Sequence, residues 1–178
     1  MSEVGLEQLW AGWRRDYVVS TTDAERRGAD DGCVFCRIAA SGPPSAQNLV
    51  VWRSPLSFAV LNAYPYASGH LLVMPVRHVG ELGELSPEES GDLWFGTEQA
   101  VAAINAAYDP DGINMGANLG RAAGAGIPSH LHMHVLPRWS GDTNFMTAVA
   151  GVRVMPESLE AGWERLHAAW PADAVQPR

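Results

Sequence analysis

The feature that most constrains the fold is the run HLHMHVL at residues 130–136, in which histidines alternate with apolar residues. Successive side chains of a β-strand point to opposite faces of its sheet. His130, His132 and His134 are therefore expected on one face, while the intervening apolar side chains enter a hydrophobic core. The run predicts a strand over Leu131–Pro137 that presents a row of three imidazoles.

The rest of the chain predicts an α+β domain in which strands form an antiparallel sheet. The run SPEE at residues 86–89 has the serine N-cap, first-turn proline and acidic residues typical of a helix start. The helix that begins there is expected to reach Tyr108 and to lie across the sheet. The other expected elements are helices over Leu6–Tyr17 and Pro156–Trp170 and strands over Asn48–Arg53, Leu56–Asn62, His70–Pro75 and Ile113–Leu119.

The composition is typical of one compact domain, because 47% of the 178 residues are hydrophobic and 18% are charged. The net charge of −8 argues against a nucleic-acid partner, and the absence of lysine excludes Schiff-base chemistry on a lysine side chain. No apolar run approaches the roughly 20 residues that cross a bilayer, and the first residues carry acids where a signal peptide carries bases. We therefore expect a cytoplasmic protein without a membrane partner.

Three alternating imidazoles allow three interpretations. A strand rises about 3.3 Å per residue, so the outer two histidines are about 13 Å apart along the backbone, and one metal ion cannot easily bind all three rings. The plainest alternative is a set of exposed histidines on a solvated sheet face. The third interpretation is that His132 acts as a nucleophile and its neighbours position it, since an imidazole with an ordinary pKa of about 6.5 is unprotonated at neutral pH.

The run HLHMHVL matches the histidine triad motif, and from about Cys33 to Ala150 the chain resembles the histidine triad (HIT) superfamily of nucleotidyl hydrolases and transferases. His70 and His78, within GHLLVMPVRH, resemble the second signature of that family. The resemblance implies a HIT-like fold. It divides the chain into an N-terminal helix and connector over residues 1–32, a HIT domain over residues 33–150 and a helical extension packed on it over residues 151–178.

The resemblance also implies which residues contact a nucleotide. Phe35 and Ile38 correspond to apolar positions that line the base pocket, and Asn118 corresponds to a phosphate-contacting asparagine. Asn62 matches the position that usually contacts the ribose, although an asparagine there is also typical of a turn.

Within the superfamily, the run HLHMHVLPRW followed by GDTNF is similar to the branch that contains diadenosine tetraphosphate phosphorylases. Trp139 and Asn144 are expected to shape the far side of the substrate pocket. Gly124 and Gly126 belong to a loop at residues 120–129, which is either an ordinary turn or a source of backbone amides for phosphate. Many members have a glutamine four residues before the first triad histidine, whereas this chain has Gly126 there, which leaves room for a different second substrate.

The activity implied by the resemblance is nucleotidyl transfer. His132 would attack the α-phosphorus of a dinucleoside polyphosphate, and inorganic phosphate or water would then attack the nucleotidyl-histidine. His134 and His70 would donate hydrogen bonds to phosphate oxygens. Phosphate as the acceptor would convert diadenosine tetraphosphate to ADP and ATP. The alternatives are hydrolysis of such nucleotides or of nucleoside phosphoramidates, and a nucleotide sensor that turns over slowly. A homodimer or larger oligomer is expected, and no organic cofactor.

Cys33 and Cys36 form a C-x-x-C pair, which by itself is compatible with redox chemistry, metal binding or buried thiols. The resemblance implies a structural zinc site formed by both cysteines, His78 and His130. A closed site of this kind would fix His130, and with it the segment that carries His132, without activating water. The alternative is two reduced cysteines in the core, with His130 orienting His132 through a hydrogen bond.

Overall fold

The computed structural model of the chain describes residues 32–142 and 156–172. Its elements in chain order are α2 (Val34–Ala40), β1 (Val50–Arg53), β2 (Ser57–Leu61), β3 (Leu71–Pro75), a 3-10 turn at Leu82–Glu84, α3 (Pro87–Tyr108), β4 (Gly112–Ala117), a 3-10 turn at Arg121–Ala123, β5 (Met133–Arg138) and α5 (Leu159–Ala169). The expected helix over Leu6–Tyr17 and the predicted contact residue Asn144 lie outside the described residues.

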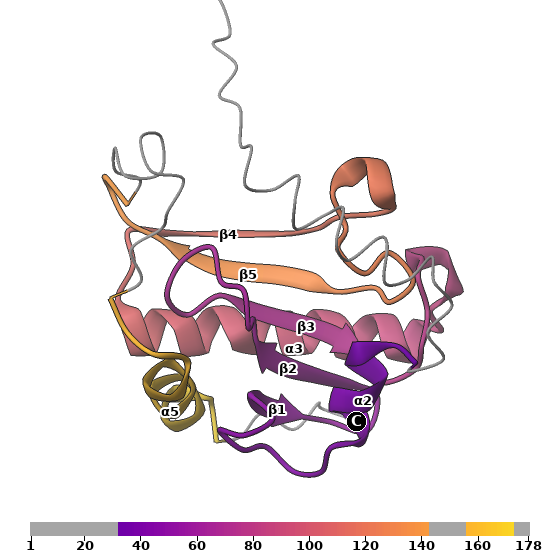
Figure 1. Cartoon of the computed structure of the whole chain (residues 1–178), viewed down its shortest axis with the longest axis horizontal. Helices are drawn as coiled ribbons and strands as arrows, with labels where there is room; N and C mark the ends of the chain where they lie inside the picture. Colours follow the sequence, from indigo (N-terminus) through magenta and orange to yellow (C-terminus); the bar gives the residue numbers. More distant parts are fainter. Residues whose placement is uncertain (1–31, 143–155, 173–178) are drawn as a thin grey trace, which may run out of the picture.

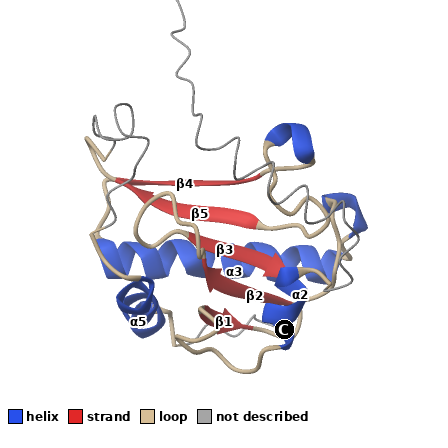
Figure 2. Ribbon diagram, viewed as in Figure 1, coloured by secondary structure: helices blue, strands red, loops and turns tan. Residues whose placement is uncertain are grey.

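The five strands form one antiparallel sheet in the order β1-β2-β3-β5-β4, which confirms the expected α+β class (Figure 2). The long helix α3 crosses one face of the sheet, and the short helix α2 lies on the other (Figure 1). Each face has its own hydrophobic core. The core under α3 includes Leu131 and Val135, and the core under α2 includes Phe35, Phe58 and Leu72.

Helix α3 begins as the sequence predicts. The Ser86 hydroxyl accepts a hydrogen bond from the Glu89 backbone N–H at 3.2 Å, and the Glu89 carboxylate accepts one from the Ser86 N–H at 2.8 Å. Gly96 lets the helix approach the sheet closely, because a Cβ atom at this position would lie 2.8 Å from the Trp52 ring. The helix ends at Tyr108, and Asp109 follows in a left-handed conformation with φ 44°.

Strand β5 is shorter at its start than the predicted strand over Leu131–Pro137. Its ladders with β3 and with β4 both end at Met133, so His134 lies in the strand, whereas His130 and His132 precede it. Strand β3 continues to Pro75, but beyond the pair Val73–Met133 no further residues of the two segments form ladder pairs. The Leu131 N–H instead donates to the Val79 carbonyl, in the connection between β3 and α3, at 2.6 Å.

Helix α5 covers the β1 edge of the sheet. Trp163 Nε1 donates to the Val50 carbonyl at 2.7 Å, and His167 Nδ1 lies 3.0 Å from the Val51 carbonyl, which can only accept. These side chains take the place of a neighbouring strand. No helix in the described ranges is long and apolar enough to cross a bilayer.

Candidate functional site

His132 and His134 lie on the face of the sheet that carries α2. The two ring centroids are 5.1 Å apart, and the Phe35 ring of α2 lies 5.1 Å from that of His132. Leu131 and Val135 enter the core under α3, as the alternation predicts. His132 does point away from that core, but Phe35 covers it, and only 6% of its surface is exposed. The ring is therefore held in a largely dry environment.

The hydrogen-bond partner of His132 determines which ring nitrogen is available. Its Nδ1 lies 2.8 Å from the backbone carbonyl of His130, and a carbonyl only accepts, so Nδ1 carries the hydrogen. Burial lowers the pKa of His132 below its ordinary value, and the bond to the carbonyl opposes this shift only in part. The ring is consequently neutral at neutral pH with a lone pair on Nε2, to which no other described residue hydrogen-bonds.

His70 lies behind His134 and is fully buried. The Tyr66 backbone N–H donates to its Nδ1 at 3.2 Å, so the hydrogen of a neutral His70 is on Nε2. That nitrogen lies 2.9 Å from His134 Nδ1, which then accepts. A neutral His134 therefore carries its own hydrogen on Nε2. This order of bonds presents a donor at His134 and a lone pair at His132.

The two asparagines identified from the sequence lie beside the rings of His70 and His134. The side-chain nitrogen of Asn62 lies 3.2 Å from His70 Nδ1, and its oxygen accepts from the Tyr64 N–H at 3.0 Å, as in a turn. The side-chain amide of Asn118, which has both donors and an acceptor, lies 3.4 Å from His134 Nε2.

The other predicted nucleotide contacts are distributed more widely. Ile38 packs against the same core as Phe35, and so does Ile127, which brings the loop of Gly124 and Gly126 to the α2 side of the sheet. Trp139 does not lie beside the histidine rings of this site. It follows β5, and its ring lies 6.3 Å from that of Tyr108, the last residue of α3.

Tyr66 also belongs to the site, although the sequence pattern does not identify it. Besides its backbone bond to His70, its ring is stacked on that of His134, with the centroids 6.0 Å apart and the planes 15° from parallel. The signal available in the sequence was an aromatic residue in the turn four positions before His70. Such a residue is also common in ordinary turns, so the pattern alone did not identify it.

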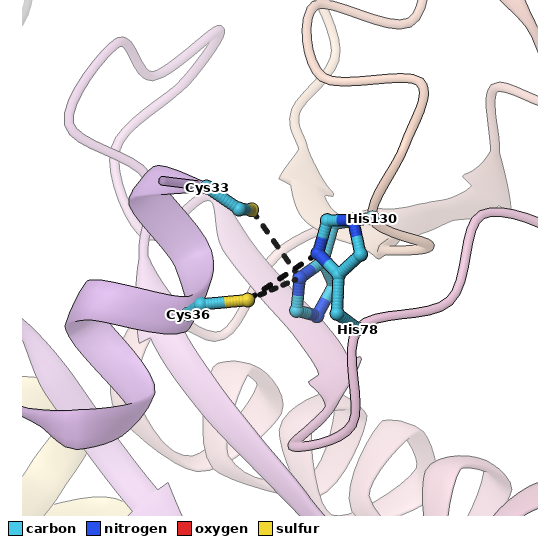
Figure 3. Close-up of side chains that lie close together, drawn as sticks. All are labelled: Cys33, Cys36, His78 and His130. Carbon is cyan, nitrogen blue, oxygen red and sulfur yellow. Dashed lines mark hydrogen bonds between the residues drawn. The ribbon is translucent and has the colours of Figure 1, made fainter. Parts of the chain in front are cut away.

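The second cluster contains Cys33, Cys36, His78 and His130 (Figure 3). Cys33 caps the start of α2 and Cys36 lies within it, whereas His78 follows β3 and His130 precedes β5. One ligand atom from each residue lies within 4.8 Å of all the others. His130 Nδ1 is 3.4 Å from Cys33 Sγ and 3.6 Å from Cys36 Sγ, and His78 Nδ1 is 3.3 Å from Cys36 Sγ. The structure therefore brings together all four predicted ligands.

The chemistry of this donor set fits zinc. Bonds of about 2.3 Å to sulfur and 2.0 to 2.1 Å to nitrogen place the ligand atoms of a tetrahedral site about 3.6 Å apart, close to the three sulfur–nitrogen distances given above. His130 Nε2 lies 2.9 Å from the Pro75 carbonyl and must donate to it, so the lone pair is on Nδ1, which faces the sulfurs. A backbone carbonyl in this position is a common outer partner of a metal-binding histidine.

His130 connects the two clusters. Its ring faces the cysteines, while its backbone carbonyl accepts the hydrogen bond from His132 Nδ1. His130 was expected either to bind a metal or to orient His132 through a hydrogen bond. Its backbone carbonyl makes the bond that orients His132, so its ring remains available as a metal ligand.

Comparison with known proteins shows the family. The HIT domain family matches residues 44–141, and the chain belongs to this family. It is 38% identical to a protein of Mycobacterium tuberculosis named AP-4-A phosphorylase. The alignment spans 167 residues, which are 93% of this chain and 85% of that protein. It is also 34% identical over 92 residues to the bis(5'-adenosyl)-triphosphatase of Dictyostelium discoideum, over 52% of this chain and 61% of that protein.

A solved structure has the same fold. The crystal structure of a Zn-bound histidine triad family protein from Mycobacterium smegmatis aligns with a TM-score of 0.62 and 28% identity, over 78% of this chain and 92% of that protein. The predicted superfamily and its phosphorylase-like branch are confirmed by these relatives.

Proposed function

We propose that the protein is a nucleotidyltransferase that cleaves diadenosine polyphosphates and transfers the nucleotide to inorganic phosphate. The observation that carries this proposal is the neutral, buried His132, whose Nδ1–H is bound by a carbonyl and whose Nε2 lone pair lies beside His134. A fixed tautomer of this kind is what a histidine nucleophile needs. The relative named AP-4-A phosphorylase supports the choice of substrate.

The reaction proceeds in two displacements. The lone pair of His132 Nε2 forms a bond to the α-phosphorus of diadenosine tetraphosphate, and the bridging P–O bond breaks, with its electrons leaving on ATP. An oxygen of inorganic phosphate then attacks the adenylyl-histidine, the P–N bond breaks, and ADP and the free imidazole are released. Each step replaces one bond to phosphorus by another, so no oxidant or reductant is needed.

His134 donates its Nε2–H to a phosphate oxygen as negative charge develops in each transition state. His70 acts through His134: its ring is buried, and its Nε2–H holds the proton of His134 on the outward nitrogen. Asn118, whose side-chain amide lies 3.4 Å from His134 Nε2, is proposed to contact the same oxygens.

The nucleotide is proposed to lie over the α2 side of the sheet. Phe35 and Ile38 supply apolar surface for the base, and Asn62 is retained as the proposed ribose contact. Gly124 and Gly126 are proposed to present backbone amides to the phosphates, and Trp139 and Asn144 to contact the distal part of the substrate.

An assay with diadenosine tetraphosphate in the presence and absence of inorganic phosphate tests the acceptor. The proposal expects ADP and ATP in equal amounts and a rate that depends on phosphate concentration. Formation of AMP and ATP at the same rate without phosphate would instead establish a hydrolase, an alternative favoured by the likeness to a bis(5'-adenosyl)-triphosphatase.

Cys33, Cys36, His78 and His130 are proposed to hold a structural zinc ion, which supplies rigidity rather than reactivity. Metal analysis of the purified protein is expected to find one zinc per chain, and a Cys33→Ala variant is expected to lose it. A parent protein without zinc would end this part of the proposal.

The protein is also proposed to form homo-oligomers through β4. Within the described ranges no strand pairs with the outer edge of β4, and Met115 in this strand is 44% exposed, whereas α5 covers the opposite edge. Uncovered strand edges readily pair with another chain. Light scattering is expected to give a mass of at least two chains, and a Met115→Lys variant is expected to lower it.

A further inference from the structure

An ion pair next to the cysteine–histidine cluster has no part in the chemistry proposed above. Arg77 Nε donates to Glu89 Oε1 at 2.7 Å, and Arg77 Nη2 donates to Glu89 Oε2 at 2.7 Å, so the guanidinium binds the carboxylate with two parallel bonds. The same Nη2 also donates to the Glu84 carbonyl at 2.6 Å. Two-bond pairs of this kind fix the direction of both side chains.

Glu89, which accepts both of these bonds, has a well-defined position. Only 8% of its surface is exposed, and it lies in the first turn of α3, where its carboxylate also accepts the Ser86 N–H. The long helix packs on three strands of the sheet, so its start has a defined position relative to β3. Arg77 is consequently attached to a rigid element rather than to another part of its own loop alone.

Arg77 is the residue before His78, and the loop they share is bound on its other side as well. The Glu84 carboxylate accepts the backbone N–H groups of Gly80 and Glu81 at 3.0 and 3.1 Å. The Val79 carbonyl accepts the Leu131 N–H at 2.6 Å, between His130 and His132. The loop therefore transmits the position of α3 both to His78 and to the segment that carries the nucleophile.

The side chain of His78 has few contacts that orient it. It is exposed, its ring meets that of His130 edge-on with the centroids 5.2 Å apart, and within the described residues its one hydrogen-bond contact is Cys36 Sγ at 3.3 Å. Its position must come mainly from the backbone on either side. We propose that Arg77 and Glu89 are positioning residues that hold His78 in place as a metal ligand by fastening the connection between β3 and α3 to the start of α3.

This inference rests on the zinc site proposed above, and its test measures zinc affinity by competition with a chromophoric chelator. Outer-shell changes typically weaken metal binding by about 10- to 100-fold, and an indirect effect such as this one is expected near the lower limit, so Arg77→Gln should weaken zinc binding by about tenfold. Arg77→Lys keeps the charge but not the two-bond geometry and should fall between the parent and Arg77→Gln.

Arg165→Gln is the matched control. Arg165 is paired with Glu157 at 3.5 Å, and the side-chain exposures of 54% and 16% resemble the 51% and 11% of Arg77 and Glu89. This second pair lies at α5, away from the cysteines, so the control should bind zinc within about twofold of the parent. The visible absorption bands of the Co²⁺-loaded proteins report ligand geometry, and they should change in Arg77→Gln and not in Arg165→Gln.

The outcomes separate the two proposals. A parent that binds zinc, with Arg77→Gln no weaker than Arg165→Gln, overturns the positioning role and leaves the zinc site intact. A parent that binds no zinc overturns both. If Arg77→Gln does not fold, Arg77→Lys and Glu89→Gln are compared with the control in the same assay, and zinc affinity equal to that of Arg165→Gln in both variants overturns the inference.

Discussion

Gly69, the residue before His70, is a position where the structure predicts a large effect from the addition of one methyl group. Its φ of +76° belongs to the left-handed region, and a Cβ atom there would lie 2.6 Å from Tyr108 Cε2. The left-handed conformation costs an L-residue about 1–2 kcal/mol, and overpacking of a filled site typically costs about 1–3 kcal/mol. We therefore expect Gly69→Ala to lower the free energy of unfolding by about 2–5 kcal/mol.

Two further glycines separate these contributions in urea denaturation experiments. Gly141 has nearly the same φ, +77°, but nothing within 4 Å of the added Cβ. It is also the third residue of a turn closed by a backbone hydrogen bond, from Asp142 N–H to the Trp139 carbonyl, as Gly69 is in the turn closed from His70 N–H to the Ala67 carbonyl, so Gly141→Ala measures the backbone cost alone. Gly112 has neither constraint and gives the baseline. The difference between Gly69→Ala and Gly141→Ala is the cost of displacing the Tyr108 ring. If Gly69→Ala is no more destabilised than Gly141→Ala, the contact with Tyr108 does not constrain the turn that precedes His70.

Four other expectations follow from the described residues. Because burial lowers the pKa of His132 from its ordinary 6.5, the acid limb of kcat/KM should have its midpoint below pH 6.5, and a midpoint above 7 would contradict a neutral, buried nucleophile. The Arg77 guanidinium holds the pKa of Glu89 at about 2 against an ordinary 4.5, so the ionised Glu89 contributes fully to stability above pH 4.5 and this contribution is lost as the pH falls toward 2. The denaturation midpoint of the parent should therefore exceed that of Glu89→Gln at pH 4.5 and above, and the difference should vanish toward pH 2; a difference that stays constant would refute the assignment. Leu166→Ala should cost about 2–5 kcal/mol of unfolding free energy, since Leu166 is fully buried where α5 docks, and a cost under 1 kcal/mol would mean that α5 is not firmly packed. Cys36→Ser, or removal of zinc from the parent by a chelator, should lower the melting temperature in a scanning experiment, whereas chelator should leave Cys36→Ser unchanged.

Much of the fold is readable from local patterns. The capping residues around Ser86 identify the start of α3, and the apolar runs of β2 and β3 identify strands that are buried throughout. The exact start of β5 cannot be predicted from its own residues, because it depends on where β3 and β4 stop pairing with it. The alternation of the histidines was informative about the faces of the chain even outside the strand.

The sequence predicts which side chains form the site, but not the backbone groups that orient them. The residue types and spacing of the histidines and cysteines indicate which side chains gather. Their hydrogen-bond directions are not predictable, because the deciding partners are backbone groups: the Tyr66 N–H and the carbonyls of Pro75 and His130. The burial of His132 under Phe35 likewise depends on how α2 packs onto the sheet, which no spacing in the sequence specifies.

The most direct test is chemical trapping of the adenylyl-enzyme. The protein is mixed with diadenosine tetraphosphate without inorganic phosphate, quenched within a single turnover into alkaline denaturant, where a phosphoramidate bond survives, and digested for peptide mass spectrometry. We expect one adenylyl group on His132, its disappearance when phosphate is added before the quench, and none in His132→Ala. Turnover in which the adenylyl group is found on another residue, or in which His132→Ala forms ADP and ATP at the parent rate, would contradict it.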